Sequence, residues 1–296
     1  MVLGLVSMLN DTASEMITPL LPLFLTATLG AGLAIVGLVE GVAEATASIL
    51  KLVSGWLADR GWNIKKLVVG GYTVSNAARP LIGFALCWGW VLILRFLDRV
   101  GKGLRTAPRD ALIAASTDEH GRGRAFGFQR ALDHTGAMLG PLLAFVLLRR
   151  GMTMEHVFMA SVIPGTALVF LVVLGLKTLA AAKPVEPPGR IRWRGLDARV
   201  KGLVLASGGL ALATTPEAFL VLWANQGGII VTWVPLLWAA AHGVKALVSG
   251  PAGALSDRLG RLRVVSIGCV PGTAHVLKGE VIIASLGYNE QVPDPA

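Results

Sequence analysis

Long hydrophobic runs separated by short polar segments dominate the pattern of this chain from its first residues onward. A helix that crosses a bilayer needs about 20 consecutive, mostly apolar residues. Runs of that length recur along the sequence, so the pattern predicts a bundle of transmembrane helices. The expected helices lie at residues 2–29, 32–57, 66–86, 89–112, 124–148, 154–176, 202–224 and 228–254, with a weaker ninth at 264–286.

Composition supports the same interpretation. Hydrophobic residues make up 54% of the 296 residues and charged residues only 15%, whereas a soluble domain carries about 25% charged residues. The predicted fold class is therefore all-α, a polytopic membrane protein of eight or nine helices. We expect three parts, which are a six-helix N-terminal bundle at 1–176, a basic cytoplasmic linker at 177–201 and a partial C-terminal bundle at 202–296.

The distribution of positive charge predicts the topology. The net charge is +9, and in polytopic membrane proteins lysine and arginine collect in cytoplasmic loops. Alternate predicted loops hold fifteen of these residues, whereas the opposite loops hold only Arg149 and Arg150. We therefore expect a cytoplasmic N-terminus, a cell membrane of the bacterial inner-membrane type, and no nucleic-acid partner.

Residue types that carry catalytic chemistry are sparse. The two cysteines, Cys87 and Cys269, lie in apolar sequence without disulfide or metal-ligand spacing. We find no nucleotide-binding loop, no histidine-rich cluster and no arrangement typical of an activated nucleophile. The sequence thus predicts no metal, no cofactor and no enzymatic activity, and a membrane enzyme is the disfavoured alternative.

A short motif occurs twice, as GWLADR from Gly55 and as GALSDR from Gly253. Both copies follow a predicted span, and two related halves around a central loop are typical of secondary transporters. The first half continues for more than 120 residues after its motif, but only about 40 residues follow the second copy. We therefore expect the second half to lack its last helices.

Because of these two motif copies, the chain resembles a transporter of the major facilitator superfamily. The resemblance covers residue 1 to about residue 270. The family's loop motif reads G-x-L-A-D-R-x-G-R-K, and the first copy departs from it at Trp62 and Asn63. The matching residues are Gly55, Asp59 and Arg60 in the first copy and Gly253, Asp257 and Arg258 in the second. The resemblance implies that this loop acts as a gate that braces two helices in the outward-open state.

Two further family motifs lie within predicted helices. R-F-L-x-x-x-G-x-G matches the stretch from Arg95 to Gly103. G-x-x-x-G-P-x-x-G, which the family associates with antiporters, matches at Gly136, Gly140 and Pro141. Small residues four apart let helices approach closely, and proline bends a helix. This stretch either restricts leak through the bundle or provides ordinary packing.

A complete member of that family has twelve helices in two six-helix bundles around a central cavity. This chain would supply eight or nine of them, as a fragment, a frameshifted product or a shortened natural variant. The partners implied by the resemblance are the lipid bilayer, a small-molecule substrate and protons, and we expect a monomer.

Five cations lie within the span predicted at 89–112. They are Arg95, Arg99, Lys102, Arg105 and Arg109, spaced three or four residues apart. This spacing places them on one helix face if the helix continues past Pro108. A cation at the bilayer centre costs about 2.5–3.5 kcal/mol on insertion scales, so the stripe cannot face lipid tails. For the last two arginines, contact with lipid headgroups is an equally acceptable alternative.

Ionisable side chains within spans indicate a functional site. Those at similar predicted depth in neighbouring helices are Asp11, Glu15, Glu40, Glu44, Arg130, Asp133 and His134. We expect Arg95 and Arg99 to find carboxylate partners in this set. The expected partners are Glu15, Glu44 and Asp133. Such pairs either exchange a proton and drive alternating access, or brace the helices without moving.

Three other residues complete the candidate site. Asp98 is expected to pair with Arg95 or Lys102 at helical spacing. His134, the single histidine deep in the six helices of the first half, is either a proton carrier or a structural residue. Glu217 corresponds in the repeat to an acid of the first helix and is a candidate cavity residue.

The function predicted from the sequence is secondary active transport by alternating access, with proton-coupled export of a small molecule. The alternative is a truncated remnant that does not transport, or a membrane interaction protein.

Overall fold

The computed structural model describes residues 2–118, 121–175, 197–198, 201–202, 205 and 217–259. Every regular element within these ranges is helical. The ninth helix expected at 264–286, nearly all of the linker, the larger part of the helix expected at 202–224 and Cys269 lie outside them. The chain divides into two compact units, residues 1–190 with 216–254 and residues 191–215 with 255–296. Almost all described residues belong to the first unit.

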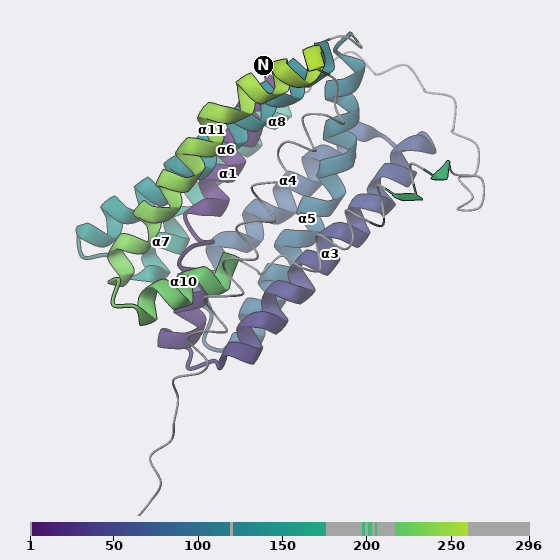
Figure 1. Cartoon of the computed structure of the whole chain (residues 1–296). Coiled ribbons are helices and arrows are strands. Elements are labelled where there is room, and N and C mark those ends of the chain that lie inside the picture. Colours follow the sequence, from purple (N-terminus) through teal and green to yellow (C-terminus); the bar gives the residue numbers. More distant parts are fainter. Residues whose placement is uncertain are drawn as a thin grey trace, which may run out of the picture. The chain divides into compact units, whose positions relative to one another are not determined.

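The helical elements follow the predicted spans closely (Figure 1). The short segments are α2 (Leu21–Leu23), η1 (Phe24–Thr28), η2 (Ile82–Phe84) and η5 (Val231–Trp233). The main helices are α1 (Val2–Glu15), α3 (Leu33–Asp59), α4 (Ile64–Leu81), α5 (Trp88–Ala115), α6 (Arg122–Arg149), α7 (Met154–Ala160), α8 (Val162–Gly175), α10 (Glu217–Gln226) and α11 (Val234–Leu259).

Two predicted spans are interrupted where proline removes backbone donors. The span expected at 2–29 ends its first helix at Glu15, turns, and resumes as α2 and the π-helical η1. Pro19 and Pro22 lie in that break, and neither can donate a hydrogen bond to the preceding turn. The span expected at 154–176 divides at Ser161, three residues before Pro164. After both interruptions the chain continues in a direction that still allows a membrane span. The interruptions nevertheless change which side chains share a helix face.

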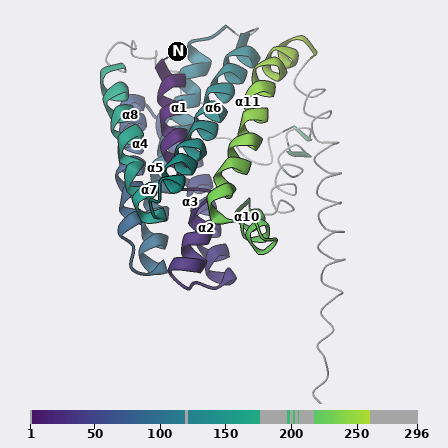
Figure 2. The ribbon, with the colours of Figure 1, turned by 90° about the vertical axis from the view of Figure 1, so that its left-hand side faces the viewer.

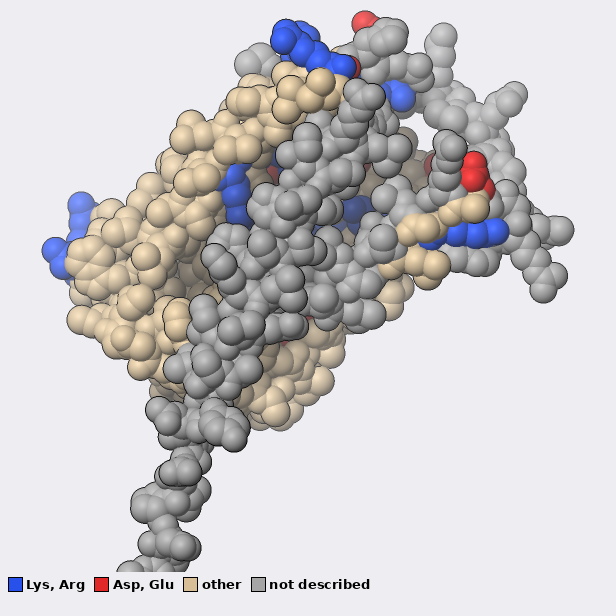
Figure 3. Space-filling view, in the orientation of Figure 1, with Lys and Arg blue, Asp and Glu red and all other residues tan. Residues whose placement is uncertain are grey.

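The outer surface of the bundle is apolar, as a lipid-facing surface requires. Leu52, Leu86 and Ile163 are 77%, 89% and 72% exposed, and most of the tan face visible in Figure 3 carries no charged side chain. Among the described residues, four helical segments are long and apolar enough to cross a membrane. They are Leu33–Asp59, Arg122–Arg149, Met154–Gly175 and Val231–Leu259. Helix α5 carries too many cations to be among them and depends on its neighbours for burial.

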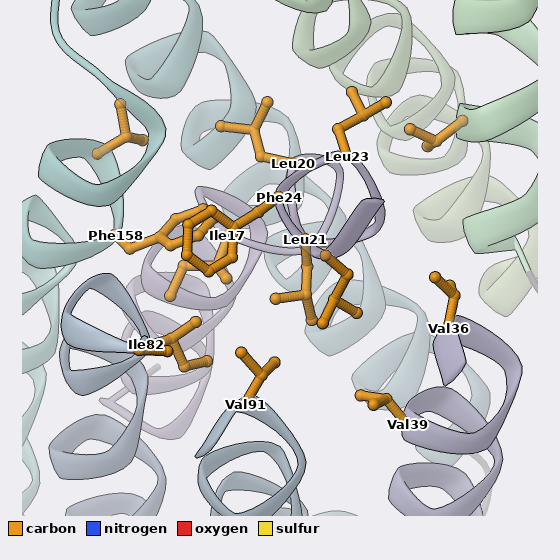
Figure 4. Close-up of a cluster of buried hydrophobic side chains, with 14 of the residues drawn as sticks. Ile17, Leu20, Leu21, Leu23, Phe24, Val36, Val39, Ile82, Val91 and Phe158 are labelled. Atoms are coloured by element: carbon orange, nitrogen blue, oxygen red, sulfur yellow. The ribbon is translucent and has the colours of Figure 1, made fainter. Parts of the chain in front are cut away.

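Helix α5 packs between α3 and α4, and α1 packs against α6 and α8 (Figures 1 and 2). α11 lies beside α6 in both views. At one end of the bundle, apolar side chains from the interrupted first span fill the interior (Figure 4). Phe24 there meets Phe158 of α7 edge to face, with ring centroids 5.2 Å apart. The polar residues of the interior lie away from this apolar end, along the middle of α1, α4 and α5.

Candidate transport site

A buried ionic network joins α4 and α5 around Asp98, which is fully buried. Its Oδ1 accepts a hydrogen bond of 2.8 Å from Nε of Arg79, and Nη1 of Arg95 lies 3.6 Å from its Oδ2. The pairing of Asp98 with Arg95 at helical spacing agrees with the prediction, whereas Arg79 was not predicted. Two guanidinium groups around one carboxylate keep that carboxylate charged, so Asp98 has the character of a fixed brace.

The network continues to two more helices. Arg79 Nη1 donates to the backbone oxygen and to Oδ1 of Asn10 on α1, at 3.2 and 3.0 Å. Arg95 Nη2 donates to Glu40 Oε1 on α3 at 3.1 Å. The two arginines and the two carboxylates cancel in charge, so α1, α3, α4 and α5 are held by a neutral set. Glu40 is its most accessible member, with a side chain 20% exposed.

Two arginines of the stripe lie inside the protein instead of at the lipid headgroups. Arg105 is 4% exposed and Arg109 is 8% exposed. Nη1 of Arg105 donates to Ser75 Oγ at 2.7 Å, and its guanidinium lies 4.6 Å from the centre of the Tyr72 ring. Arg109 donates to Ser7 and to its neighbour Asp110. The headgroup alternative is therefore wrong for both, because α4 and α1 supply polar partners at that depth.

The carboxylates expected to pair with the α5 arginines have other contacts. Asp133 Oδ1 accepts a hydrogen bond of 2.9 Å from Nε2 of Gln129, and its Oδ2 lies 3.7 Å from Nη1 of Arg130. Both partners belong to the same helix as Asp133. Glu44 is exposed, and Glu15 binds a neutral donor. The predicted partners of Arg95 were therefore wrong apart from Asp98. The error arose because depth alone cannot show which way each helix is rotated.

The two acids of α1 are held by neutral groups. Asn10 Nδ2 donates to Asp11 Oδ1 at 2.8 Å. The indole Nε1 of Trp238 on α11 donates to Glu15 Oε2 at 3.0 Å. The indole of Trp238 therefore reaches the interior of the bundle. Glu15 thus connects the first span with a helix more than 200 residues later in the chain.

Two histidines meet between α6 and α11. Nδ1 of His134 lies 3.2 Å from Nδ1 of His242, and the ring centroids are 5.3 Å apart. One ring must donate and the other accept, so the contact requires at least one neutral imidazole. The sequence treated His134 as a lone histidine and missed its partner. His242 follows Trp238 by one helical turn, which was a usable signal of a polar face on α11.

Glycines set the spacing of α6 on both sides. A side chain at Gly136 would collide with the backbone of Met8, and one at Gly140 with the backbone around Thr12, both on α1. At the other end, a Cβ on Gly127 would lie 2.8 Å from the backbone oxygen of Ser249 on α11, and Gly253 packs against the same region. The motif that contains Gly140 and Pro141 therefore packs α6 against α1.

The two glycines of the α5 motif face different helices. Gly101 lies against Gly71 and Ser75 of α4, and Gly103 lies against Leu50 and Ala47 of α3. Ser54 of α3 donates to the backbone oxygen of Gly103 at 2.8 Å. These close contacts place α5 near enough to both neighbours for short polar side chains to reach it.

The gating residues lie at helix ends. Asp59 ends α3, and the guanidinium of Arg60 stacks 3.9 Å from the centre of the Trp56 ring. Gly55 of the same motif meets Ala107 of α5, with its Cβ position 3.5 Å away. Asp257 and Arg258 lie in the last turn of α11, and Glu217 is the first residue of α10. Within the ranges given above, no group of three acidic, histidine or cysteine residues could hold a metal ion.

A polar stripe on α4 could have been found from the sequence. Tyr72, Ser75, Asn76 and Arg79 recur at three- and four-residue spacing in the span expected at 66–86, which places them on one helix face. Tyr72, Ser75 and Arg79 contact α5 or α1. Asn76 bonds within α4. The same criterion that singled out the α5 cations would have identified Arg79.

Comparison with known proteins identifies the family of this membrane protein. A sequence profile of the Major Facilitator Superfamily matches residues 3–274. The chain belongs to this family of polytopic membrane transporters, as its motifs predicted. A relative described as an uncharacterized MFS-type transporter of Methanocaldococcus jannaschii is 33% identical over 296 residues, which cover 97% of this chain and 71% of the relative.

Shorter and structural similarities agree with that assignment. Multidrug resistance protein MdtH of Aeromonas hydrophila is 29% identical over 146 residues, 49% of this chain and 36% of that protein. The inward-facing crystal structure of a bacterial homolog of the human lysosomal transporter Spinster has a TM-score of 0.65 and 17% identity, and covers 88% of this chain. The chain spans 62% of that structure. Peptide transporter POT follows with a TM-score of 0.56.

Proposed function

We propose that this protein is a monomeric secondary active transporter that exports a small organic molecule in exchange for protons by alternating access. In this proposal the N-terminus is cytoplasmic, and α1 to α8 move against α10 and α11. The observation that carries it is the hydrogen bond from Trp238 to Glu15. This bond joins the two groups of helices at a carboxylate within hydrocarbon depth.

Glu15 is suited to exchange a proton because no guanidinium group among the described residues contacts it directly. Its polar contacts are the indole N–H of Trp238 and, at 3.5 Å, the hydroxyl of Thr18. A hydrogen bond to an ionised carboxylate is roughly twice as strong as a neutral one. Protonation of Glu15 therefore weakens the link to α11, and deprotonation strengthens it. One proton then biases the equilibrium between the two arrangements of the helices.

The fixed brace around Asp98 supports this division of roles. The brace keeps α1, α3, α4 and α5 together as one body, while two hydrogen bonds to α11 run through Trp238 and His242. Export rather than uptake is favoured by the α6 motif and by the similarity to MdtH. In this scheme the His134–His242 contact opens together with the Glu15–Trp238 bond.

The test uses the whole chain reconstituted in liposomes with an imposed pH gradient and the dyes carboxyfluorescein, rhodamine 123 and ethidium. Wild-type protein is expected to move at least one dye in a gradient-dependent manner. Glu15→Gln keeps the hydrogen-bond geometry but cannot ionise, so gradient dependence is lost while downhill dye exchange continues. Glu155→Gln, the same chemical change on α7, serves as the control and leaves flux unchanged.

Two results would contradict the proposal. Absence of gradient-driven flux for every dye would favour the non-transporting alternative. Normal proton-driven flux in Glu15→Gln would remove Glu15 from the coupling step.

A further inference from the structure

Arg99 is a buried cation of α5 that lies outside the ionic network around Asp98. It is 8% exposed, and its Nε is buried without a hydrogen-bond partner. Within the part of the chain that the structure describes, no carboxylate lies within ion-pair distance of Arg99, in contrast to Arg95 and Arg109. A buried guanidinium without an anion is unfavourable, so its position calls for an anionic partner beyond those that the described residues supply.

The carboxylates of the neighbourhood are already committed or accessible to water. Asp98 and Glu40 are held by Arg79 and Arg95. Glu15 binds Trp238. The remaining acid is Glu44, which is exposed on α3 and interacts with Arg99 electrostatically without forming an ion pair. The resident acids therefore leave the hydrogen-bonding capacity of Arg99 unused.

Arg99 lies near acidic groups of both α1 and α3. It precedes Gly103, which contacts α3, by one helical turn. Glu15 on α1 and Glu44 on α3 both interact electrostatically with Arg99 and with Lys102, which follows on the same face. Lys102 is exposed to solvent. The two cations thus lie next to the carboxylate at which the proposed proton exchange occurs.

We propose that Arg99, assisted by Lys102, binds the anionic group of the transported molecule, so that the substrates are small organic anions bearing a carboxylate, sulfonate or phosphate. This inference rests on the proposed function and names its substrate class. A guanidinium group binds such anions through two parallel hydrogen bonds. Glu44 competes for the same cations, and Glu15 repels the anion when ionised. Protonation of Glu15 then favours anion binding and loosens the link to α11 in the same step.

The experiment measures equilibrium binding by fluorescence anisotropy, without any gradient, to the whole chain in phosphatidylcholine nanodiscs. Carboxyfluorescein is the anionic probe, and rhodamine 123 is a cation with the same ring system. Wild-type protein is expected to bind carboxyfluorescein in preference to rhodamine 123. Arg99→Gln should weaken anion binding by about tenfold or more, the loss of one charge-assisted contact. Arg99→Lys should retain part of the affinity.

Two further variants sharpen the result. Glu44→Gln removes the competing carboxylate and should tighten carboxyfluorescein binding. Arg150→Gln removes a positive charge at an exposed helix end and should leave binding unchanged. A second set of nanodiscs containing phosphatidylglycerol identifies the source of the anion. If phosphatidylglycerol lowers carboxyfluorescein binding and this effect requires Arg99, the bound anion is a lipid headgroup. If carboxyfluorescein binding is undiminished, the bound anion is a soluble molecule.

Equal carboxyfluorescein affinity in wild type and Arg99→Gln would overturn the inference, as would preferential binding of rhodamine 123. Because no gradient is present, this failure is separate from that of the proposed function. Anion binding through Arg99 without proton-driven flux would contradict the coupling mechanism alone. Proton-driven flux of ethidium without anion binding would contradict the substrate class alone.

Discussion

Helices α5 and α6 have the same length, 28 residues, and each continues through a proline, but α5 adds a network of buried charges to its glycine contacts, whereas α6 depends mainly on glycines. α5 contacts its neighbours through buried charges that reach α1, α3 and α4. α6 contacts α1 and α11 through glycines that place backbone against backbone. Lipid tails are as apolar as leucine side chains, so polar bonds and close packing are the two ways to associate helices in a bilayer.

The difference matters for movement. A proton or a bound anion can change a charged contact while the helices stay in place, whereas a glycine contact changes only when the helices separate. Groups around α5 can therefore respond to a proton or to a bound anion. The surface of α6 determines how closely neighbouring helices approach. The following predictions test this contrast, beginning with the largest expected effect.

Asp98→Asn should be the most destabilising substitution, because it leaves Arg79 buried with a neutral partner and Arg95 with Glu40 as its one remaining carboxylate among the described residues. Breaking a buried ion pair in this way costs about 3–5 kcal/mol. The measurement is the free energy of unfolding in mixed micelles titrated with SDS. Asp110→Asn, whose side chain is 30% exposed beside Arg109, should cost about 1 kcal/mol or less. Equal losses in the two variants would show that the network around Asp98 is not a brace.

Gly140→Ala should destabilise the protein by about 1–3 kcal/mol, since the added methyl group collides with the backbone of α1. Gly70→Ala is the matched control on α4, where the structure leaves open space. There the higher helix propensity of alanine should stabilise the protein by up to about 1 kcal/mol. The same SDS titration measures both, and a neutral Gly140→Ala would show that α6 can move away from α1 without cost.

His134→Phe and His242→Phe should each lose the histidine contact, and the double variant should lose little more. A double-mutant cycle is expected to give a coupling energy of about 0.5–1.5 kcal/mol, the contribution of one hydrogen bond. Additive losses would mean that the two rings stabilise the protein independently. The cycle also tests whether the contact between α6 and α11 uses polar groups in addition to glycine packing.

Glu40→Gln and Glu44→Gln should differ although both acids lie on one face of α3. Glu40 pairs with Arg95 and is partly exposed, so its replacement should cost about 1 kcal/mol or less. Replacement of the exposed Glu44 should leave the free energy of unfolding unchanged. If Glu44→Gln is the more damaging variant, the pairing of Arg95 is not the one described.

The sequence by itself determined the membrane class, the family, most spans and the burial of Arg95 and Arg99. Each of these follows from local properties, because the length of an apolar run and the three- and four-residue spacing of charges need no knowledge of neighbouring helices. The helix expected at 89–112 runs past Pro108, and the structure confirms this continuation in α5.

The tertiary structure alone decided which charges meet. Arg79 pairs with Asp98, Glu40 rather than Glu15 reaches Arg95, and Trp238 contacts Glu15 across more than 200 residues. Such pairings depend on the rotation and depth of each helix, which are set by glycine contacts and by proline breaks such as the one after Glu15. Rotation of a helix by one residue moves a side chain by about 100° around the axis. Spacing therefore shows which side chains share a face, and only the packed bundle shows what that face meets.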